Sequence, residues 1–152
     1  MITTKNTISV LNDLIEINND RVAGFEKAIA DINEENIDLK TLFQEYTAQS
    51  RKFSQELTAI VGSHAGQGEV ETGTSVAGNL HRAWIDVKAL FGGRDRKSIL
   101  EEAERGEDAI KKAYSDAIGS GSLVDEALQL VTEQSQEIKS AHDKIRALRD
   151  SV

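Results

Sequence analysis

Histidines and carboxylates are the residues of this sequence that could do metal chemistry. The histidines are His64, His81 and His142, and carboxylates crowd the segment 101–108. A di-iron centre inside a four-helix bundle takes a Glu from each of two helices and a Glu-x-x-His motif from each of the other two. The residues three positions before the histidines are Val61, Gly78 and Lys139. No histidine completes the motif, so the sequence predicts no intact di-iron centre.

The acidic segment 101–108 leaves two interpretations open. As a cation site, it would supply Glu104 or Glu107, with His142 added from another helix. As ordinary helix electrostatics, its acids complement the positive end of the helix dipole and form stabilising pairs with bases four residues further on. The pairs at that spacing are Glu101–Arg105, Glu107–Lys111 and Asp108–Lys112. We favour the electrostatic interpretation and expect no metal ion. The alternative is iron, manganese or zinc held by Glu104, Glu107 or His142 with neighbours from other helices.

Other catalytic and cofactor motifs are missing from the sequence. It has no cysteine, which excludes thiolate zinc sites, iron–sulfur clusters and a cysteine nucleophile. The glycine-rich segment 62–73 lacks both the P-loop pattern and the dinucleotide-binding pattern. No serine stands in a nucleophile-elbow context. We therefore expect neither enzymatic activity nor a bound cofactor.

The charge balance limits the partners of the chain. Among 152 residues, 26 are Asp or Glu and 18 are Lys or Arg, which gives a formal net charge of −8. An acidic chain is a poor match for the phosphate backbone of nucleic acids. The sequence shows no signal peptide and no apolar run of membrane-spanning length. These features are typical of a cytoplasmic protein that binds neither nucleic acid nor membrane.

The elements that would position these residues are helices. Apolar side chains recur at alternating steps of three and four, the period of one helix face, and no proline interrupts them. The apolar face of the first helix includes Val22, and that of the last begins at Val124. The helix before the last one starts at Asp95 or Ser98. The helices that this period predicts span about residues 4–32, 36–61, 75–91, 96–118 and 122–150.

Loop lengths predict how the helices connect. Short turns join the first two long helices and the last two, so each pair forms an antiparallel hairpin. The segment 62–91 between the pairs includes the short helix and must return the chain along the bundle. We expect a single all-α domain over residues 1–152, with the extra short helix in the crossover between the second and third long helices. This crossover connectivity is that of ferritin-like four-helix bundles.

Each long helix turns polar near its midpoint, which predicts a polar layer across the bundle centre. Its members are Asn18, Gln49, Ser50, Glu107, Gln134 and Ser135. Amides are poor substitutes for carboxylates as ligands of two dications. We favour a hydrogen-bonded network that fixes the helix register. Within it, Glu107 is charged if Arg21 reaches it, and otherwise burial favours its neutral form.

Four stretches of the sequence carry a family resemblance. They are Leu11-Asn12-Asp13-Leu14-Ile15 with Asp20-Arg21 and Gly24-Phe25, Gly78-Asn79-Leu80-His81-Arg82-Ala83-Trp84, Glu104-Arg105-Gly106-Glu107-Asp108, and His142-Asp143-Lys144-Ile145-Arg146. Together they resemble a bacterial family of uncharacterised four-helix-bundle proteins in the ferritin-like superfamily. The resemblance implies the bundle fold and a part in a stress response, and it supplies no activity and no catalytic residue.

These patterns predict a non-enzymatic helical bundle that acts through its helix faces, as a homo-oligomer or with a protein partner. The first alternative is a metal-binding ferritin-like protein with a non-standard or degenerate metal site. A carrier of a small ligand, held near Trp84 or in the bundle interior, is the second alternative.

Overall fold

The computed structural model describes residues 4–65 and 95–152, and these residues form helices joined by short turns. The elements are α1 (Thr4–Asp31), the 3₁₀ turn η1 (Glu34–Asn36), α2 (Ile37–Ala65), α4 (Arg96–Gly119) and α5 (Asp125–Asp150). The all-α prediction is confirmed, since neither described range contains a strand. The predicted short helix over 75–91 lies outside these ranges. Among the described helices, none combines the length and the apolar character needed to cross a membrane.

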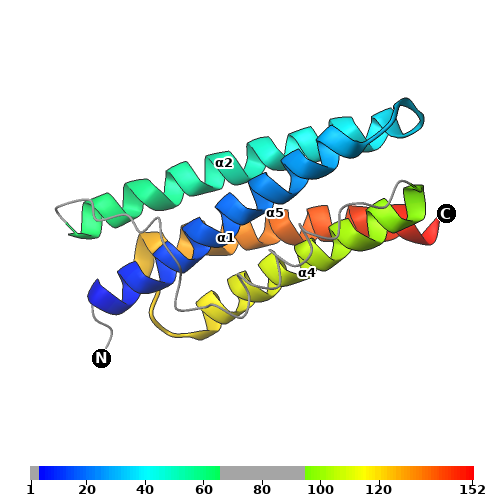
Figure 1. Cartoon of the computed structure of the whole chain (residues 1–152). Helices are drawn as coiled ribbons and strands as arrows, with labels where there is room; N and C mark the ends of the chain where they lie inside the picture. The colour runs from blue at the N-terminus through cyan, green and yellow to red at the C-terminus, as the bar shows by residue number, and fades with distance from the viewer. Residues whose placement is uncertain (1–3, 66–94) are drawn as a thin grey trace.

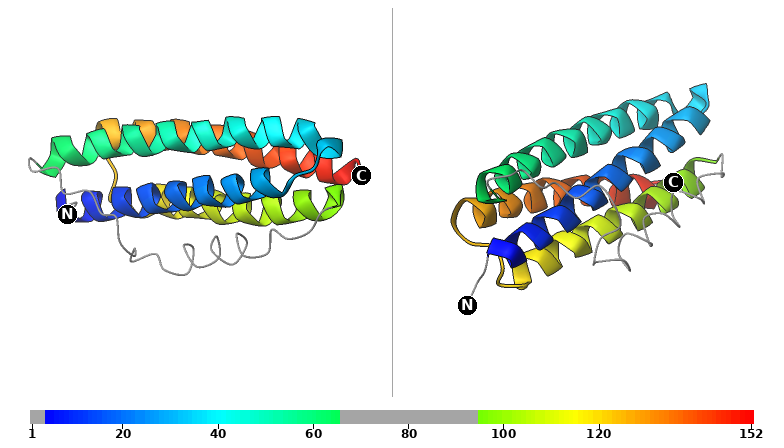
Figure 2. Two further views of the ribbon diagram at one scale, coloured as in Figure 1. Left: turned by 45° about the horizontal axis from the view of Figure 1, so that its top comes forward. Right: turned by 60° about the vertical axis from the view of Figure 1, so that its left-hand side comes forward.

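The four long helices pack side by side as an elongated bundle (Figure 1). α1 and α2 form one antiparallel hairpin, α4 and α5 form the other, and α1 of the first lies against α4 of the second. From the side, α1 and α4 make one layer and α2 and α5 make the other (Figure 2). α1 begins at one end of the bundle and α5 finishes at the opposite end. The bundle is therefore about as long as one of its long helices.

α2 and α4 run in the same direction, although they are consecutive among the long helices (Figure 1). α2 finishes at the end of the bundle where α1 begins, and α4 starts at the opposite end. α2 has 29 residues, which corresponds to a length of about 43 Å. Ala65 and Asp95 are therefore separated by the length of the bundle, as the loop lengths predict.

Local signals set the ends of the helices. At the start of α4, the side chain of Asp95 accepts a hydrogen bond from the backbone N–H of Ser98 at 2.7 Å, so Asp95 is the N-cap. After α4, Gly121 has a φ of 75°, a left-handed conformation that glycine adopts without strain. Arg96 in the first turn of α4 forms an ion pair with Asp38 of α2 at 2.7 Å. This pair joins the two hairpins at one end of the bundle.

Apolar side chains from all four helices fill the space between the two layers. Their periodic spacing puts them on one face of each helix, where burial stabilises the bundle by the hydrophobic effect. The most completely buried include Leu11, Phe25, Leu39, Phe43, Phe53, Leu57, Leu100, Ile110, Val131 and Ile138.

The buried face of α1 is rotated slightly from the predicted one. Val22 is only partly buried, whereas its neighbour Arg21 is completely buried. With 3.6 residues per turn, Arg21 lies about one turn from both Asn18 and Phe25, which are also fully buried. The prediction of Val22 as a core residue was therefore wrong by one position, and a cation stands where an apolar side chain was expected.

α5 begins later than its apolar pattern predicts. The predicted start is at residue 122, but the helix begins at Asp125, and Val124 is the N-cap residue with 39% of its surface exposed. The buried face of α5 starts at Ala127. The backbone before the helix accounts for this, because Val124 is extended, with φ −139° and ψ 163°, and Asp125 has a φ of 52°. The carbonyl oxygen of Ser122 also accepts a hydrogen bond from Thr7 Oγ1 at 2.7 Å, which joins this turn to α1.

Candidate functional site

Arg21 lies at the centre of the bundle and is completely buried. Its Nε and Nη2 donate to the two carboxylate oxygens of Glu107 on α4, at 2.8 and 2.9 Å. Its Nη1 donates to Gln49 Oε1 and Ser50 Oγ on α2, at 2.8 and 2.9 Å. Four of the five N–H donors of the guanidinium are therefore bonded. The side chains of Arg21 and Glu107 are both 0% exposed, so this is a bidentate ion pair removed from bulk water.

Two aromatic rings lie against the Arg21 guanidinium. Its Cζ is 5.5 Å from the ring centroid of Phe25 and 5.3 Å from that of Tyr46, distances at which cation–π attraction adds to the ion pair. Burial, and after it the Glu107 carboxylate, raises the pKa of the Tyr46 phenol to about 12. Tyr46 is therefore neutral at physiological pH, and Glu107 is the anion that balances Arg21.

A chain of hydrogen bonds continues from Arg21 through the other helices. Ser50 Oγ donates to Asn18 Oδ1 at 2.8 Å, and Asn18 Nδ2 donates to the hydroxyl oxygen of Tyr114 at 2.8 Å. The Tyr114 hydroxyl donates to Gln134 Oε1 on α5 at 2.6 Å. Burial raises the pKa of this phenol, which keeps the proton that the last bond needs. The network therefore links side chains of α1, α2, α4 and α5.

The hydrogen-bonded network contains most of the residues that the sequence places in a polar layer. The structure brings together Asn18, Gln49, Ser50, Glu107 and Gln134. Ser135 is partly exposed beside Gln134. The network also includes Arg21 and Tyr114, and Gln134 Nε2 donates to Glu56 Oε1 at 3.2 Å. Tyr114 could have been added from its spacing, since seven residues after Glu107 is two helical turns on the same face.

The bundle centre does not fit a di-iron centre. Such a centre takes carboxylates from all four helices and an imidazole from two of them. Here Arg21 binds both oxygens of Glu107, and the neighbouring helices bring the amides of Gln49 and Gln134, which suit such ions poorly. The cation that neutralises Glu107 is thus a guanidinium. The contact between Arg21 and Glu107, one of the two alternatives for Glu107, is present.

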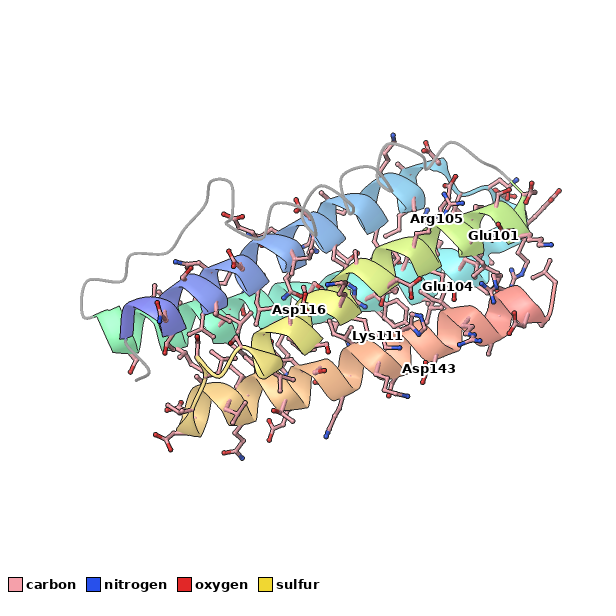
Figure 3. The ribbon with its side chains drawn as sticks, turned by 90° about the horizontal axis from the view of Figure 1, so that it is seen from below. Glu101, Glu104, Arg105, Lys111, Asp116 and Asp143 are labelled. Atoms are coloured by element: carbon pink, nitrogen blue, oxygen red, sulfur yellow. The ribbon has the colours of Figure 1, made fainter. Side chains whose placement is uncertain are left out.

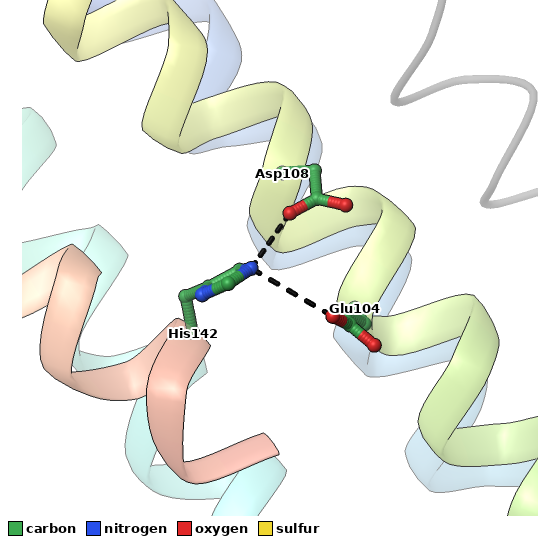
Figure 4. Close-up of side chains that lie close together, drawn as sticks. All are labelled: Glu104, Asp108 and His142. Atoms are coloured by element: carbon green, nitrogen blue, oxygen red, sulfur yellow. Dashed lines mark hydrogen bonds and ion pairs between the residues drawn. The ribbon is translucent and has the colours of Figure 1, made fainter. Parts of the chain in front are cut away.

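A second group of ionisable side chains joins α4 to α5. His142 of α5 points between Glu104 and Asp108, which lie one turn apart on α4 (Figure 4). His142 Nε2 is 2.6 Å from Asp108 Oδ1 and 3.9 Å from Glu104 Oε2. The imidazole is 5% exposed and the Glu104 side chain 11%, whereas the Asp108 side chain is 60% exposed. We call these three residues the His142 cluster.

Further charged groups hold the His142 cluster in place. His142 Nδ1 is 3.1 Å from Asp143 Oδ1, and Arg149 Nη1 donates to Glu104 Oε1. Lys139 pairs with the other oxygen of Asp143 at 2.8 Å. The hydrogen bonds from Lys139 and then from His142 lower the pKa of Asp143 from 3.8 to about 2. Asp143 is therefore a carboxylate at physiological pH.

The structure separates the metal-ligand candidates of the sequence. Glu104 and His142 meet in the His142 cluster, whereas Glu107 binds Arg21 in the interior. Asp108 completes the cluster and was not a candidate. A signal for it was available, because Asp108 is four residues after Glu104 and so lies on the same helix face.

Some of the ion pairs expected along α4 are replaced by others. Both carboxylate oxygens of Glu107 accept hydrogen bonds from Arg21, which takes the place expected for Lys111. Asp108 faces His142, and Lys112 pairs instead with Asp116 at 2.8 Å. Figure 3 shows the labelled charged side chains of α4 and α5, with Lys111 and Asp116 farther along α4 than Glu101, Glu104 and Arg105. The side chain of His64 and the 78–84 motif, with His81 and Trp84, lie outside the described part of the chain.

The family of the chain follows from its match to a family model. A family model with the description "Domain of unknown function (DUF2383)" matches residues 6–120. The chain belongs to this family. The DUF2383 match covers α2, α4 and nearly all of α1, with Arg21 and Glu107, while α5 with Gln134 and His142 follows it. No curated protein and no solved structure matches the chain.

In this DUF2383 protein, Glu107→Gln is expected to lower the free energy of unfolding by about 3–5 kcal/mol, because Arg21 is then a buried charge without a counter-ion. Gln has nearly the size of Glu, so a cavity does not explain the loss. Urea denaturation followed by circular dichroism measures it. As a control, the double variant Arg21→Met/Glu107→Leu removes both charges and is expected to recover most of the loss. A loss below about 1 kcal/mol, the value of one ordinary hydrogen bond, would contradict this role of the pair.

The Asp143 carboxyl is expected to titrate with a pKa of about 2, below its ordinary value of 3.8. Since the pKa is lowered in the folded state, the contribution of Asp143 to stability is present above 3.8 and is lost as the pH falls through about 2. Lys139→Gln removes the larger cause and is expected to raise this pKa toward 3.8. Carbon-13 NMR of the carboxyl group against pH measures the shift.

The matched control for this titration is Lys112→Gln, which breaks the same kind of i,i+4 pair at Asp116. It is expected to leave the pKa of Asp143 unchanged. An Asp143 pKa that is equally low in the parent chain and in Lys139→Gln would show that Lys139 is not the main cause.

Proposed function

We propose that this DUF2383 protein is a non-enzymatic bundle of the ferritin-like kind that acts by assembly. The observation that carries the proposal is the buried Arg21–Glu107 pair. This pair and its hydrogen-bond partners occupy the level at which ferritin-like bundles hold their metal ions. The parallel course of α2 and α4 supports the ferritin-like connectivity (Figure 1). Because the polar side chains of the interior bind one another in this network, the protein would bind its partner through the outer faces of the helices.

The outer side of α5 carries opposite charges near its two ends. Glu126 near its start and Lys144 near its end are both exposed. They are 144 − 126 = 18 residues apart, which is about five full turns and puts them on the same side of the helix. A second copy packed antiparallel along α5, about a two-fold axis at the level of residue 135, would bring each Glu126 next to Lys144 of the other copy. The same packing would set Glu133 opposite Glu137 of the other copy, since both are exposed on the side of Glu126 and Lys144. The charge pairs at the two ends of the interface are therefore the attraction that a two-fold dimer on this side would use.

The groove beside α5 also favours self-association on this side. It lies between α2 and α5, has a volume of about 390 Å³, and is lined by Ile60, Glu126, Leu130 and Glu133, among others. Leu130 is partly exposed there. A helix of a second copy along this side would remove apolar surface of Leu130 from water, which stabilises the complex. The charge pairs at the ends and the apolar burial of Leu130 therefore favour the same side of α5.

A cytoplasmic, bacterial setting and a part in a stress response belong to the same proposal. The cysteine-free composition is compatible with the first, and the family resemblance supports the others. A basic protein partner on the acidic side of α5 is the alternative form of assembly. Metal binding by a non-standard ferritin-like site is the alternative function, and the His142 cluster is the observation that favours it.

Sedimentation equilibrium tests the assembly. The parent chain is expected to form a dimer, with twice the 16.6 kDa mass of one chain. Glu126→Lys and Lys144→Glu each place like charges opposite one another twice in the dimer, so each is expected to weaken dimerisation by about tenfold or more. The double variant Glu126→Lys/Lys144→Glu restores both pairs with reversed polarity. Its dissociation constant is expected to return close to that of the parent chain.

The control is Lys27→Glu on α1, which changes the net charge as Lys144→Glu does but lies on a helix diagonal to α5 (Figure 2). It is expected to leave the dimer intact. A chain that stays monomeric at every concentration would contradict the proposed assembly. A double variant no better than either single variant would contradict the α5 interface.

A further inference from the structure

We infer that the His142 cluster is a binding site for a divalent metal ion of the zinc class, with Glu104, Asp108 and His142 as its protein ligands. An imidazole nitrogen combined with carboxylate oxygens is a donor set of zinc sites. Here the three ligand atoms all lie within 4.8 Å of one another. They come from α4 and α5, whose packing fixes the separation of the ligands. The inference does not depend on the proposed assembly.

The distances within the His142 cluster bracket those of a tetrahedral ion. Zinc binds imidazole nitrogen and carboxylate oxygen at about 2.0–2.2 Å, which sets neighbouring ligand atoms about 3.4 Å apart. His142 Nε2 is 2.6 Å from Asp108 Oδ1 and 3.9 Å from Glu104 Oε2. Asp108 has to withdraw by about 1 Å to admit the ion, and its exposed side chain allows that movement. The buried His142 and Glu104 supply the fixed part of the site.

His142 is oriented to ligate through Nε2. Its Nδ1 is 3.1 Å from Asp143 Oδ1, and Lys139 holds the other oxygen of Asp143 at 2.8 Å. A metal-ligating imidazole usually donates its second ring N–H to a carboxylate in this way, which fixes the tautomer and strengthens the ligating nitrogen. The residue that follows His142 in the chain therefore supplies the outer partner that a metal site needs.

Glu104 is oriented by a different residue. Arg149 donates to its Oε1, and Oε2 is the oxygen that faces His142. This bond positions the carboxylate, but the positive charge of Arg149 also opposes a second cation on the same group. Removal of that charge is therefore expected to strengthen metal binding.

The site would join two helices and remain open on one side. Three protein ligands leave a fourth position for water or another small ligand. Asp108 marks the open side, since its side chain is 60% exposed. A bound ion would cross-link α4 and α5 near the end of the bundle where α5 finishes, outside the Arg21 network.

Isothermal titration calorimetry of the full chain with zinc chloride tests the site. One zinc ion per chain is expected, and His142→Gln and Asp108→Asn are each expected to weaken its binding by at least about tenfold. Asp143→Asn removes no ligand and is still expected to weaken binding by about tenfold, because the imidazole loses its outer carboxylate. Circular dichroism establishes that each variant is folded. Asp108 is exposed, so Asp108→Asn decides the outcome if His142→Gln does not fold.

Two controls separate ligation from general electrostatics. Asp116→Asn removes the same charge from an exposed carboxylate of α4 outside the cluster, and is expected to leave zinc binding unchanged. Arg149→Gln is expected to strengthen binding more than Arg146→Gln, since both remove one positive charge from α5 but Arg149 bonds Glu104. A parent chain without saturable zinc binding would overturn the inference. So would binding that is undiminished in His142→Gln and Asp108→Asn.

Discussion

A guanidinium buried away from water has to meet hydrogen-bond acceptors on several sides, and that requirement organises this bundle. Arg21 finds its acceptors in Glu107 on α4 and in Gln49 and Ser50 on α2. A shift of either helix by one turn would leave a buried charge without its partner, which costs several kcal/mol. The hydrogen bonds continue to Gln134 on α5. A shift of α5 would therefore also leave buried polar groups without their partners. Apolar packing tolerates many exchanges of similar volume, so the polar network specifies the register of the helices more strictly than the apolar core does.

The Arg21–Glu107 pair also separates the chemistry of the interior from that of the surface. In the interior, a positive side chain neutralises the buried carboxylate, and the site has no place for a pair of metal ions. At the surface between α4 and α5, His142 faces two carboxylates and has a third behind it. Proteins of one fold carry unrelated functions in sites placed on that fold. A helical bundle with a structural network at its centre, and the proposed ion or second copy bound on its outside, is consistent with that principle.

Most of the fold could be predicted from the sequence because helix periodicity is a local signal. It was harder to predict which residues are buried near the centre, since arginine is almost never fully buried unless it is paired. That expectation favoured Val22 over Arg21 as a core residue, and the partner of Arg21 is 86 residues away in the chain. The His142 cluster shows the same limit. Glu104 and His142 were candidates from their residue types, but the contact of Asp108 with His142 depends on how α4 and α5 are rotated against each other, which neither helix encodes alone.

Nitrogen-15 NMR of the guanidinium groups is the most direct measurement of the buried pair. Two hydrogen bonds to Glu107 should stop rotation about the Nε–Cζ bond of Arg21, and burial should protect its Nε–H from exchange with water. We expect a slowly exchanging Nε–H and separately resolved Nη signals for Arg21. Arg51, whose side chain is 56% exposed, should show fast exchange and averaged signals in the same spectrum. If Arg21 behaves like Arg51, the guanidinium is not held in the bundle centre, and the pair does not organise the fold.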